Sequence, residues 1–100
     1  MKKDNYKTDM IFRVDTTRAF KGIVFVLFPH EVANSKGNVL SYHHIGQHSP
    51  ADYKYCIAKS RKATKEELEP LKSELESIGY NVNVISRQNY DKYLISYNSK

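Results

Sequence analysis

The chain has 100 residues, 40% of them hydrophobic and 27% charged, and a single cysteine. This length predicts one domain over residues 1–100, and the composition excludes both a disordered chain and one that spans a membrane. No disulfide can form within the chain, and no apolar segment of a secretory signal follows the N-terminus, so we expect a cytoplasmic protein.

The net charge of +5 is unevenly distributed along the sequence. Five of the eleven acidic residues fall within residues 65–78, so the rest of the chain is more strongly basic than the total. A basic surface favours anionic partners such as nucleic acid, a nucleotide or an acidic protein face. The alternative is an ordinary basic surface that keeps the protein soluble.

The N-terminal half of the chain predicts strands. Residues 1–9 are polar and lack a period, which is typical of a loose arm. Alternation or continuous apolar character then predicts three strands, at residues 10–15, 23–28 and 39–42. The second is apolar on both faces, so it should be central in its sheet and end at Pro29, which cannot donate to the ladder. We expect turns at 16–22, with Gly22 at positive φ, and at 34–37.

Two helices are predicted next. Ser49 as N-cap with Pro50 at the first helical position indicates a helix from 49 to about 60, although a strand over 53–58 also fits the residues. The second helix begins with a capping box that Thr64 and Glu67 form. Its core residues and its terminal glycine follow at helical spacing: Leu68, Leu71, Leu75, Ile78 and Gly79. Pro70 is irregular inside it.

The last elements complete a fold class. Residues 80–87 alternate as a strand does, residues 93–97 favour a final strand, and residues 98–100 should be a loose end. This order predicts an α+β fold, with a mainly antiparallel sheet of four to five strands and two helices packed on one face.

The polar stretch at residues 41–53 stands out within this fold. It holds three of the four histidines, at positions 43, 44 and 48, together with a glycine, a proline and several other hydrogen-bonding side chains. We therefore expect the functional residues in this stretch.

The same stretch carries a resemblance to a known group of proteins. The matching residues are Phe28-Pro29, Ser41-Tyr42-x-His44-x-Gly46-Gln47-His48-x-x-Ala51-Asp52-Tyr53, Ala63-Thr64-x-x-Glu67 and Leu71-x-x-Glu74-Leu75-x-x-Ile78-Gly79-Tyr80. This pattern resembles an uncharacterised family of small proteins carried by phages, prophages and other mobile elements of bacteria. His43 stands where that family usually has an apolar residue. The resemblance implies no activity, but it implies an accessory protein of a mobile element, in the cytoplasm of a bacterial host cell.

Metal binding and catalysis are two chemistries that the stretch could support. His44 and His48 are four residues apart, and Asp52 or Cys56 could complete a zinc site. His48 with Asp52 could form an acid–base pair, and two histidines could serve a phosphodiesterase that needs no metal. No known catalytic or metal motif accompanies them, so the sequence favours a protein that is not an enzyme and has no cofactor.

Anion binding fits the stretch better. A helix that starts at Ser49 would present free N–H groups to a phosphate, and the tyrosines could stack on a base. We therefore predict a non-enzymatic, homo-oligomeric protein that binds a nucleotide-like small molecule, such as a cyclic-nucleotide or ADP-ribose-type immune signal. The predicted ligand-binding residues are Tyr42, His44, Gly46, Gln47, His48, Ser49, Asp52, Tyr53 and Arg61.

A regulator that binds nucleic acid or a host protein is the alternative. It would inhibit a host defence enzyme or act on DNA through the basic surface and the C-terminal tyrosines Tyr90, Tyr93 and Tyr97.

Overall fold

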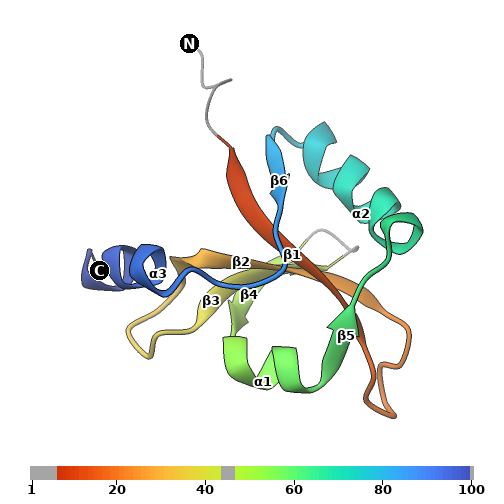
Figure 1. Ribbon diagram of the computed structural model, residues 1–100, viewed down its shortest axis with the longest axis horizontal. Coiled ribbons are helices and arrows are strands. Elements are labelled where there is room, and N and C mark those ends of the chain that lie inside the picture. The colour runs from red at the N-terminus through yellow and green to blue at the C-terminus, as the bar shows by residue number, and fades with distance from the viewer. Residues whose placement is uncertain (1–6, 44–46, 100) are drawn as a thin grey trace.

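The computed structural model describes residues 7–43 and 47–99 of the chain. In these residues, four strands come first, and three helices then alternate with two short strands (Figure 1). The elements are β1 (Thr8–Asp15), β2 (Val24–Val32), β3 (Val39–His43), β4 (Gln47–Ala51), α1 (Tyr53–Ala58), β5 (Ser60–Lys62), α2 (Lys65–Ser77), β6 (Val82–Val84) and α3 (Tyr90–Asn98). The strands form one sheet in the order β4-β3-β2-β1-β5, antiparallel at every step, and β6 pairs with β1 in parallel. The α+β class and the mainly antiparallel sheet are thus confirmed.

The helices lie on both faces of the sheet, and this differs from the expected placement on one face. Alternation along β1 turns Met10 and Phe12 towards α2, where Leu71 and Leu75 join their cluster. Ile11 belongs to a second cluster on the opposite face, with residues of α1 and α3 packed against it. Figure 1 shows α2 above the strands and α1 below them. The physical reason is that a central strand with two apolar faces needs a cover on each.

Strand β2 is longer than predicted, because it continues through Pro29 to Val32. Its pairing with β3 is regular up to Phe28 opposite Leu40, and then shifts before Val32 pairs with Val39. Pro29 lies in this irregular part, where the ladder needs no amide hydrogen from it. Its carbonyl oxygen accepts a hydrogen bond from Nε2 of Gln88, 2.8 Å away.

The predicted start of the first helix is wrong by several residues. Ser49 and Pro50 belong to β4, and the N-cap of α1 is Asp52, whose carboxylate accepts from the amide of Tyr55 at 3.1 Å. The helix favoured over 53–58 is confirmed against the competing strand. Strand β4 is at the edge of the sheet, and an edge is where a strand tolerates a proline.

Helix α2 follows its sequence signals closely. The amide of Glu67 donates to Oγ1 of Thr64 at 3.2 Å, and the amide of Thr64 donates back to Oε1 of Glu67 at 2.9 Å, which confirms the capping box. The helix continues past Pro70. It ends at Ser77 with Ile78 as C-cap, and Gly79 follows with a φ of +113°. The amides of Gly79 and Tyr80 donate to the carbonyls of Glu76 and Leu75.

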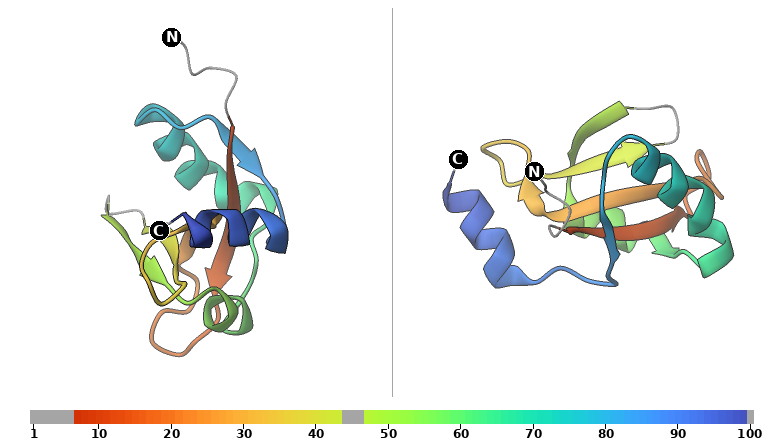
Figure 2. Two further views of the ribbon diagram at one scale, coloured as in Figure 1. Left: turned by 90° about the vertical axis from the view of Figure 1, so that its left-hand side faces the viewer. Right: turned by 90° about the horizontal axis from the view of Figure 1, so that it is seen from above.

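The C-terminal segment is a helix where a strand was predicted. Residues 93–97 lie in α3, whose N-cap is Asn89, and β6 covers only a short part of the predicted strand at 80–87. The helical spacing of the tyrosines 90, 93 and 97 stacks their rings, whereas a strand would place Tyr90 on the opposite face from Tyr93 and Tyr97. Figure 2 shows α3 at the end of the sheet, beside the β2–β3 turn. The expected loose ends also shift, because β1 begins at Thr8 and α3 includes Asn98.

Candidate functional site

The polar stretch at 41–53 forms the β3–β4 hairpin and the start of α1. Tyr42 pairs with His48 across the two strands, and Ser41 pairs with Ser49. Since successive side chains of a strand point to opposite faces, the predicted ligand-binding residues are divided between the two sides of the sheet. His44, Gly46 and the side chain of Gln47 lie outside the described part of the structure.

Tyr42 and His48 lie on the α2 side, where their rings contact each other and their polar atoms form hydrogen bonds with neighbouring side chains. Their rings are 4.8 Å apart, and Nε2 of His48 is 3.0 Å from the hydroxyl of Tyr80. The buried Tyr42 donates its hydroxyl hydrogen to Glu74, and this hydrogen bond, followed by burial, raises the pKa of Tyr42. These groups connect the hairpin to α2, which is a structural role.

The predicted residues on the other side also have structural partners. The carbonyl of Ser49 accepts from Oγ of Ser41 at 2.8 Å, and the hydroxyl of Tyr53 accepts from the amide of Gln88 at 2.9 Å. The carboxylate of Asp52 caps α1 and accepts from the amide of Tyr55.

Arg61 lies far from the hairpin, at the opposite edge of the sheet on β5. Its guanidinium donates to both carboxylate oxygens of Glu67, at 2.8 and 2.7 Å. The hydrogen bonds from Arg61 and from the backbone of Thr64 lower the pKa of Glu67 to about 2. The structure therefore does not bring Arg61 together with Tyr42 and His48.

Three further features concern metal binding, membrane helices and the C-terminal tyrosines. Within 7–43 and 47–99, no three His, Cys, Asp or Glu side chains are placed to hold a metal ion. None of the helices in these ranges has the length and apolar character to cross a membrane. Of the C-terminal tyrosines, Tyr93 stacks with Tyr90 and with Tyr97, at 5.9 and 6.1 Å between ring centroids.

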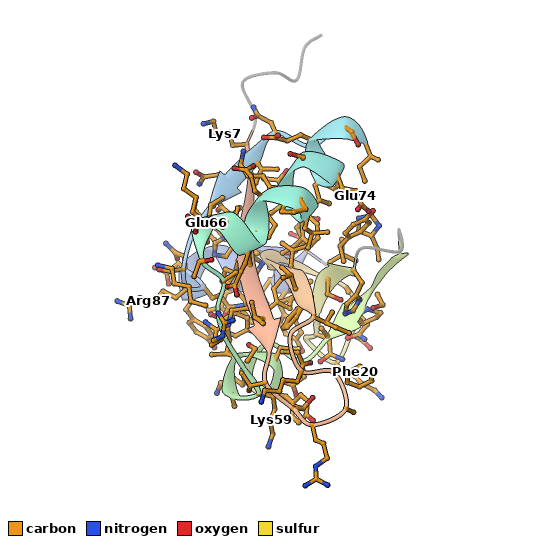
Figure 3. All side chains as sticks on the ribbon, turned by 90° about the vertical axis from the view of Figure 1, so that its right-hand side faces the viewer. Lys7, Phe20, Lys59, Glu66, Glu74 and Arg87 are labelled. Atoms are coloured by element: carbon orange, nitrogen blue, oxygen red, sulfur yellow. The ribbon has the colours of Figure 1, made fainter. Side chains whose placement is uncertain are left out.

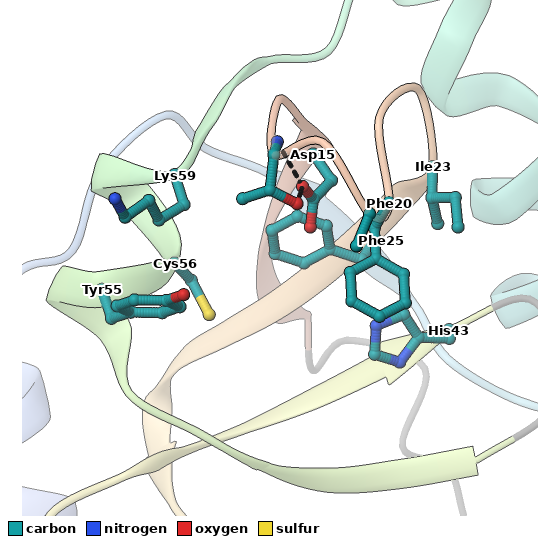
Figure 4. Close-up of a pocket in the computed structure, with 10 residues that line it drawn as sticks. Asp15, Phe20, Ile23, Phe25, His43, Tyr55, Cys56 and Lys59 are labelled. Carbon is teal, nitrogen blue, oxygen red and sulfur yellow. Dashed lines mark hydrogen bonds between the residues drawn. The ribbon is translucent and has the colours of Figure 1, made fainter.

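A groove on the α1 side is the better candidate (Figure 4). Its volume is about 840 Å³, and most of its lining is apolar. The close-up shows α1 residues on one side, loop and strand residues on the other, and Asp15 between them. The lining residues are Asp15, Thr17, Ala19, Phe20, Ile23, Phe25, His43, Tyr55, Cys56 and Lys59.

The local sequence explains how the groove forms. Strand alternation places Asp15, Phe25 and His43 on the face that α1 covers, with the rings of Phe25 and His43 6.1 Å apart. The loop at 16–23 closes where the amide of Gly22, at a φ of +90°, donates to the carbonyl of Asp15. The predicted positive φ at Gly22 is thus confirmed, and the turn that it allows forms one wall of the groove.

Hydrogen bonds hold α1 as the other wall. The amide and the hydroxyl of Thr16 both donate to the carbonyl of Lys59, each at 3.0 Å. From β1, Nη2 of Arg13 donates to the carbonyls of Ile57 and Ser60, at 3.1 and 2.8 Å. The groove is therefore built into the fold and needs no ligand to form it.

Large apolar side chains are exposed around this groove. Phe20 and Tyr55 are each 59% exposed, and Ile23 is 47% exposed. Single exposed apolar residues are common, but several around one hollow mark a binding surface. Figure 3 shows Phe20 and Lys59 at one end of the molecule, away from Glu66 and Glu74 of the acidic helix α2.

The polar groups of the groove are few. Oδ1 of Asp15 accepts from the amide and the hydroxyl of Thr17, at 2.8 and 2.5 Å. The ammonium of Lys59 lies 5.9 Å from the centre of the Tyr55 ring. Burial, and then the charges of Asp52 and Asp15, raise the pKa of the Cys56 thiol, so this thiol stays protonated at neutral pH.

Sequence reasoning missed this groove because its residues come from three separate stretches of the chain, at 15–25, 43 and 55–59. The available signals were Phe20 in a turn segment, where an aromatic residue is unusual, and Tyr55 between two lysines on a short helix.

Comparison with known proteins found no family model, no curated protein and no solved structure that matches this chain. The resemblance to small proteins of mobile elements stays a prediction.

Proposed function

We propose that this protein is a non-enzymatic binder of a small, anionic, aromatic molecule, and that a nucleotide-like compound occupies the groove between α1 and the 16–23 loop. The observation that carries the proposal is the exposed aromatic lining of a groove of about 840 Å³. That volume lies within the range of about 300–1,000 Å³ that is typical of small-molecule sites.

The apolar walls support a planar ligand. Phe20 and Tyr55 lie on opposite sides of the groove, and the rings of Phe25 and His43, 6.1 Å apart, lie on the same side as Phe20. A flat aromatic ring between such walls would remove apolar surface from water and gain stacking contacts, worth about 1–3 kcal/mol for a base on an aromatic side chain.

The charges around the groove support an anion. Lys59 lines it, and Lys54 is exposed on the same helix. Arg18 and Lys21 are exposed on the loop that forms the opposite wall. These cations attract a phosphate or carboxylate that projects from the groove into solvent.

The proposal includes no reaction. Cys56 is the thiol in the groove, and its raised pKa keeps it in the weakly nucleophilic thiol form. Capture and release of a ligand is the activity that these residues favour. Sequestration of a cyclic-nucleotide or ADP-ribose-type signal is the physiological role that the mobile-element resemblance adds to this proposal.

A thermal-shift screen followed by calorimetry tests the proposal. The panel contains cyclic mono- and dinucleotides, ADP-ribose, nucleoside monophosphates, an apolar aromatic acid and short DNA. A ligand present at a hundred times its dissociation constant adds about 2.7 kcal/mol of stability, which shifts the midpoint by several degrees for a chain of this size.

Two variants separate the groove from the site first predicted in the hairpin. Phe20→Ala removes an exposed groove side chain, whereas His48→Ala removes an exposed side chain on the opposite face. We expect loss of nucleotide binding in the Phe20 variant and unchanged binding in the His48 variant. The reverse result would place the ligand at the hairpin. If no compound of the panel shifts the unfolding midpoint, the proposal is overturned.

Stoichiometry and salt dependence test the remaining expectations. The groove is lined by one chain, so we propose one ligand per chain, whether or not the protein is a homo-oligomer. Binding of nucleic acid through phosphate contacts would weaken steeply as salt rises, which a stacked pocket ligand would not do. Steep salt dependence with DNA would favour the nucleic-acid regulator instead, and capture of a host protein would favour the inhibitor.

A further inference from the structure

One oxygen of the Asp15 carboxylate has no donor in the groove. Oδ1 accepts both hydrogen bonds from Thr17, while none of the residues at 7–43 and 47–99 donates to Oδ2. Asp15 is partly buried, and the side chains beside it in the groove include Phe20, Ile23 and Phe25. A carboxylate oxygen without a donor therefore faces a hollow that is otherwise mostly apolar.

The cost of covering this acceptor depends on the ligand. A molecule that fills the groove displaces the water around Asp15, and an acceptor buried without a donor carries its full desolvation penalty. A ligand with an N–H group at that point replaces the water, whereas one without such a group leaves the carboxylate unsatisfied. A site of this kind rejects the analogue that lacks the donor.

The basic residues add a second constraint. Asp15 and Lys59 both line the groove, and the exposed Lys54, Arg18 and Lys21 belong to the helix and the loop that form its two walls. A ligand that binds both the Asp15 carboxylate and the cations has a hydrogen-bond donor on its ring and an anionic group at its other end. A simple aromatic acid satisfies the outer charges but not Asp15.

Resting on the function proposed above, we propose that Asp15 is a specificity-determining residue that selects rings with an exocyclic amino group. The ligand class is then an amino-substituted nucleotide, in which the amino group donates to Oδ2 of Asp15 and the phosphate lies near Lys59. Thr17 positions the carboxylate, because its two hydrogen bonds occupy Oδ1 and leave Oδ2 towards the ring.

Asp15→Asn is the decisive variant. The side-chain oxygen of asparagine can still accept both hydrogen bonds from Thr17, so the turn is preserved, but an NH₂ donor replaces Oδ2. The matched control is Asp52→Asn, because Asp52 is an exposed N-cap outside the groove lining and asparagine caps helices equally well.

Calorimetry is performed with two pairs of nucleotides that differ in one amino group. The pairs are adenosine monophosphate with purine riboside monophosphate, and the 2′-deoxy forms of the same two nucleotides. In the wild type and in Asp52→Asn, we expect the amino member to bind about tenfold more tightly or better. In Asp15→Asn, this preference should disappear or reverse.

The failures of the two proposals are distinguishable. Equal binding of both members by the wild type, with binding still lost in Phe20→Ala, overturns the role of Asp15 but leaves the groove as the binding site. A preference that persists in Asp15→Asn does the same. If the wild type binds none of the four nucleotides, this inference is overturned, and if the wider panel is also silent the proposed function is overturned with it.

Discussion

The hydroxyl of Tyr93 donates a hydrogen bond to the carbonyl oxygen of Gly37, 2.8 Å away, and connects α3 to the turn between β2 and β3. Gly37 has a φ of +85°, and a Cβ atom there would lie 2.6 Å from the same tyrosine hydroxyl. The glycine is thus required both by the backbone and by the helix that packs on it.

We expect Gly37→Ala to destabilise the protein more than Gly22→Ala. Gly22 has a similar φ of +90°, but a Cβ atom there would meet nothing within 4 Å. The Gly22 variant should therefore lose only the conformational term of about 1–2 kcal/mol, and the Gly37 variant should lose more. Urea unfolding measures both. Adding Tyr93→Phe should reduce the excess, and equal losses in the two glycine variants would contradict the contact.

Leu75→Ala should cost about 2–5 kcal/mol, because the side chain is fully buried between α2 and the sheet. Ile78 was expected on the same apolar face, yet it is 53% exposed beyond the end of the helix. Ile78→Ala is therefore the control, with a small effect of about 0.5 kcal/mol. Similar losses at both positions, measured by the urea midpoint, would mean that the described packing of α2 is incorrect.

Acid should weaken the contact between β5 and α2 through Glu67. The pKa of Glu67 is about 2 in the folded protein, against 4.5 for an ordinary glutamate. A lowered folded-state pKa contributes stability above the ordinary value, and this contribution is lost as the pH falls from about 4.5 to 2. Glu67→Gln keeps an acceptor for the capping box but removes the charge that Arg61 binds. We expect the variant to lose less stability than the wild type between pH 5 and pH 2.5, and identical losses would exclude Glu67 as a cause.

His30 should hold the start of α3 in place. Its Nδ1 lies 2.9 Å from Oδ2 of Asp9, and its Nε2 accepts from the amide of Asn89 at 2.7 Å. Burial alone would raise the pKa of Asp9, but hydrogen bonds from Asn83 and His30 and the charge of Lys92 lower it overall.

His30→Ala would leave the amide of Asn89 without this acceptor, so hydrogen exchange should accelerate at the start of α3 and not in α2. The exposed His43, changed to alanine, provides the control. Unchanged exchange in α3 would show that other contacts hold this helix.

Elements with strong local signals could be predicted from the sequence. The capping box of Thr64 and Glu67 and the apolar residues of β2 depend only on neighbouring positions, and both were found. The signal at Ser49 and Pro50 was misleading, because a serine and a proline suit a helix start and an edge strand equally well. Helix α3 was missed because a row of aromatic residues also favours a strand.

The candidate site could not be predicted in the same way. The polar stretch seemed to be one site because its residues are adjacent in sequence, but strand alternation separates Tyr42 from Ser49. The groove has the opposite character. The groove forms only when β1, β2, β3 and α1 are assembled, which brings together Asp15, Phe20, His43 and Tyr55. No local sequence pattern predicts that these residues lie close together.

The edges of the sheet limit how this protein can associate with itself. Pro50 gives strand β4 one position without an amide hydrogen, and the opposite edge consists of the short strands β5 and β6, which pair with different parts of β1. Neither edge is a good template for another strand, and such edges protect β proteins from aggregation. An oligomer of this chain would therefore bury helices or a face of the sheet, and its sheets would remain separate within each subunit.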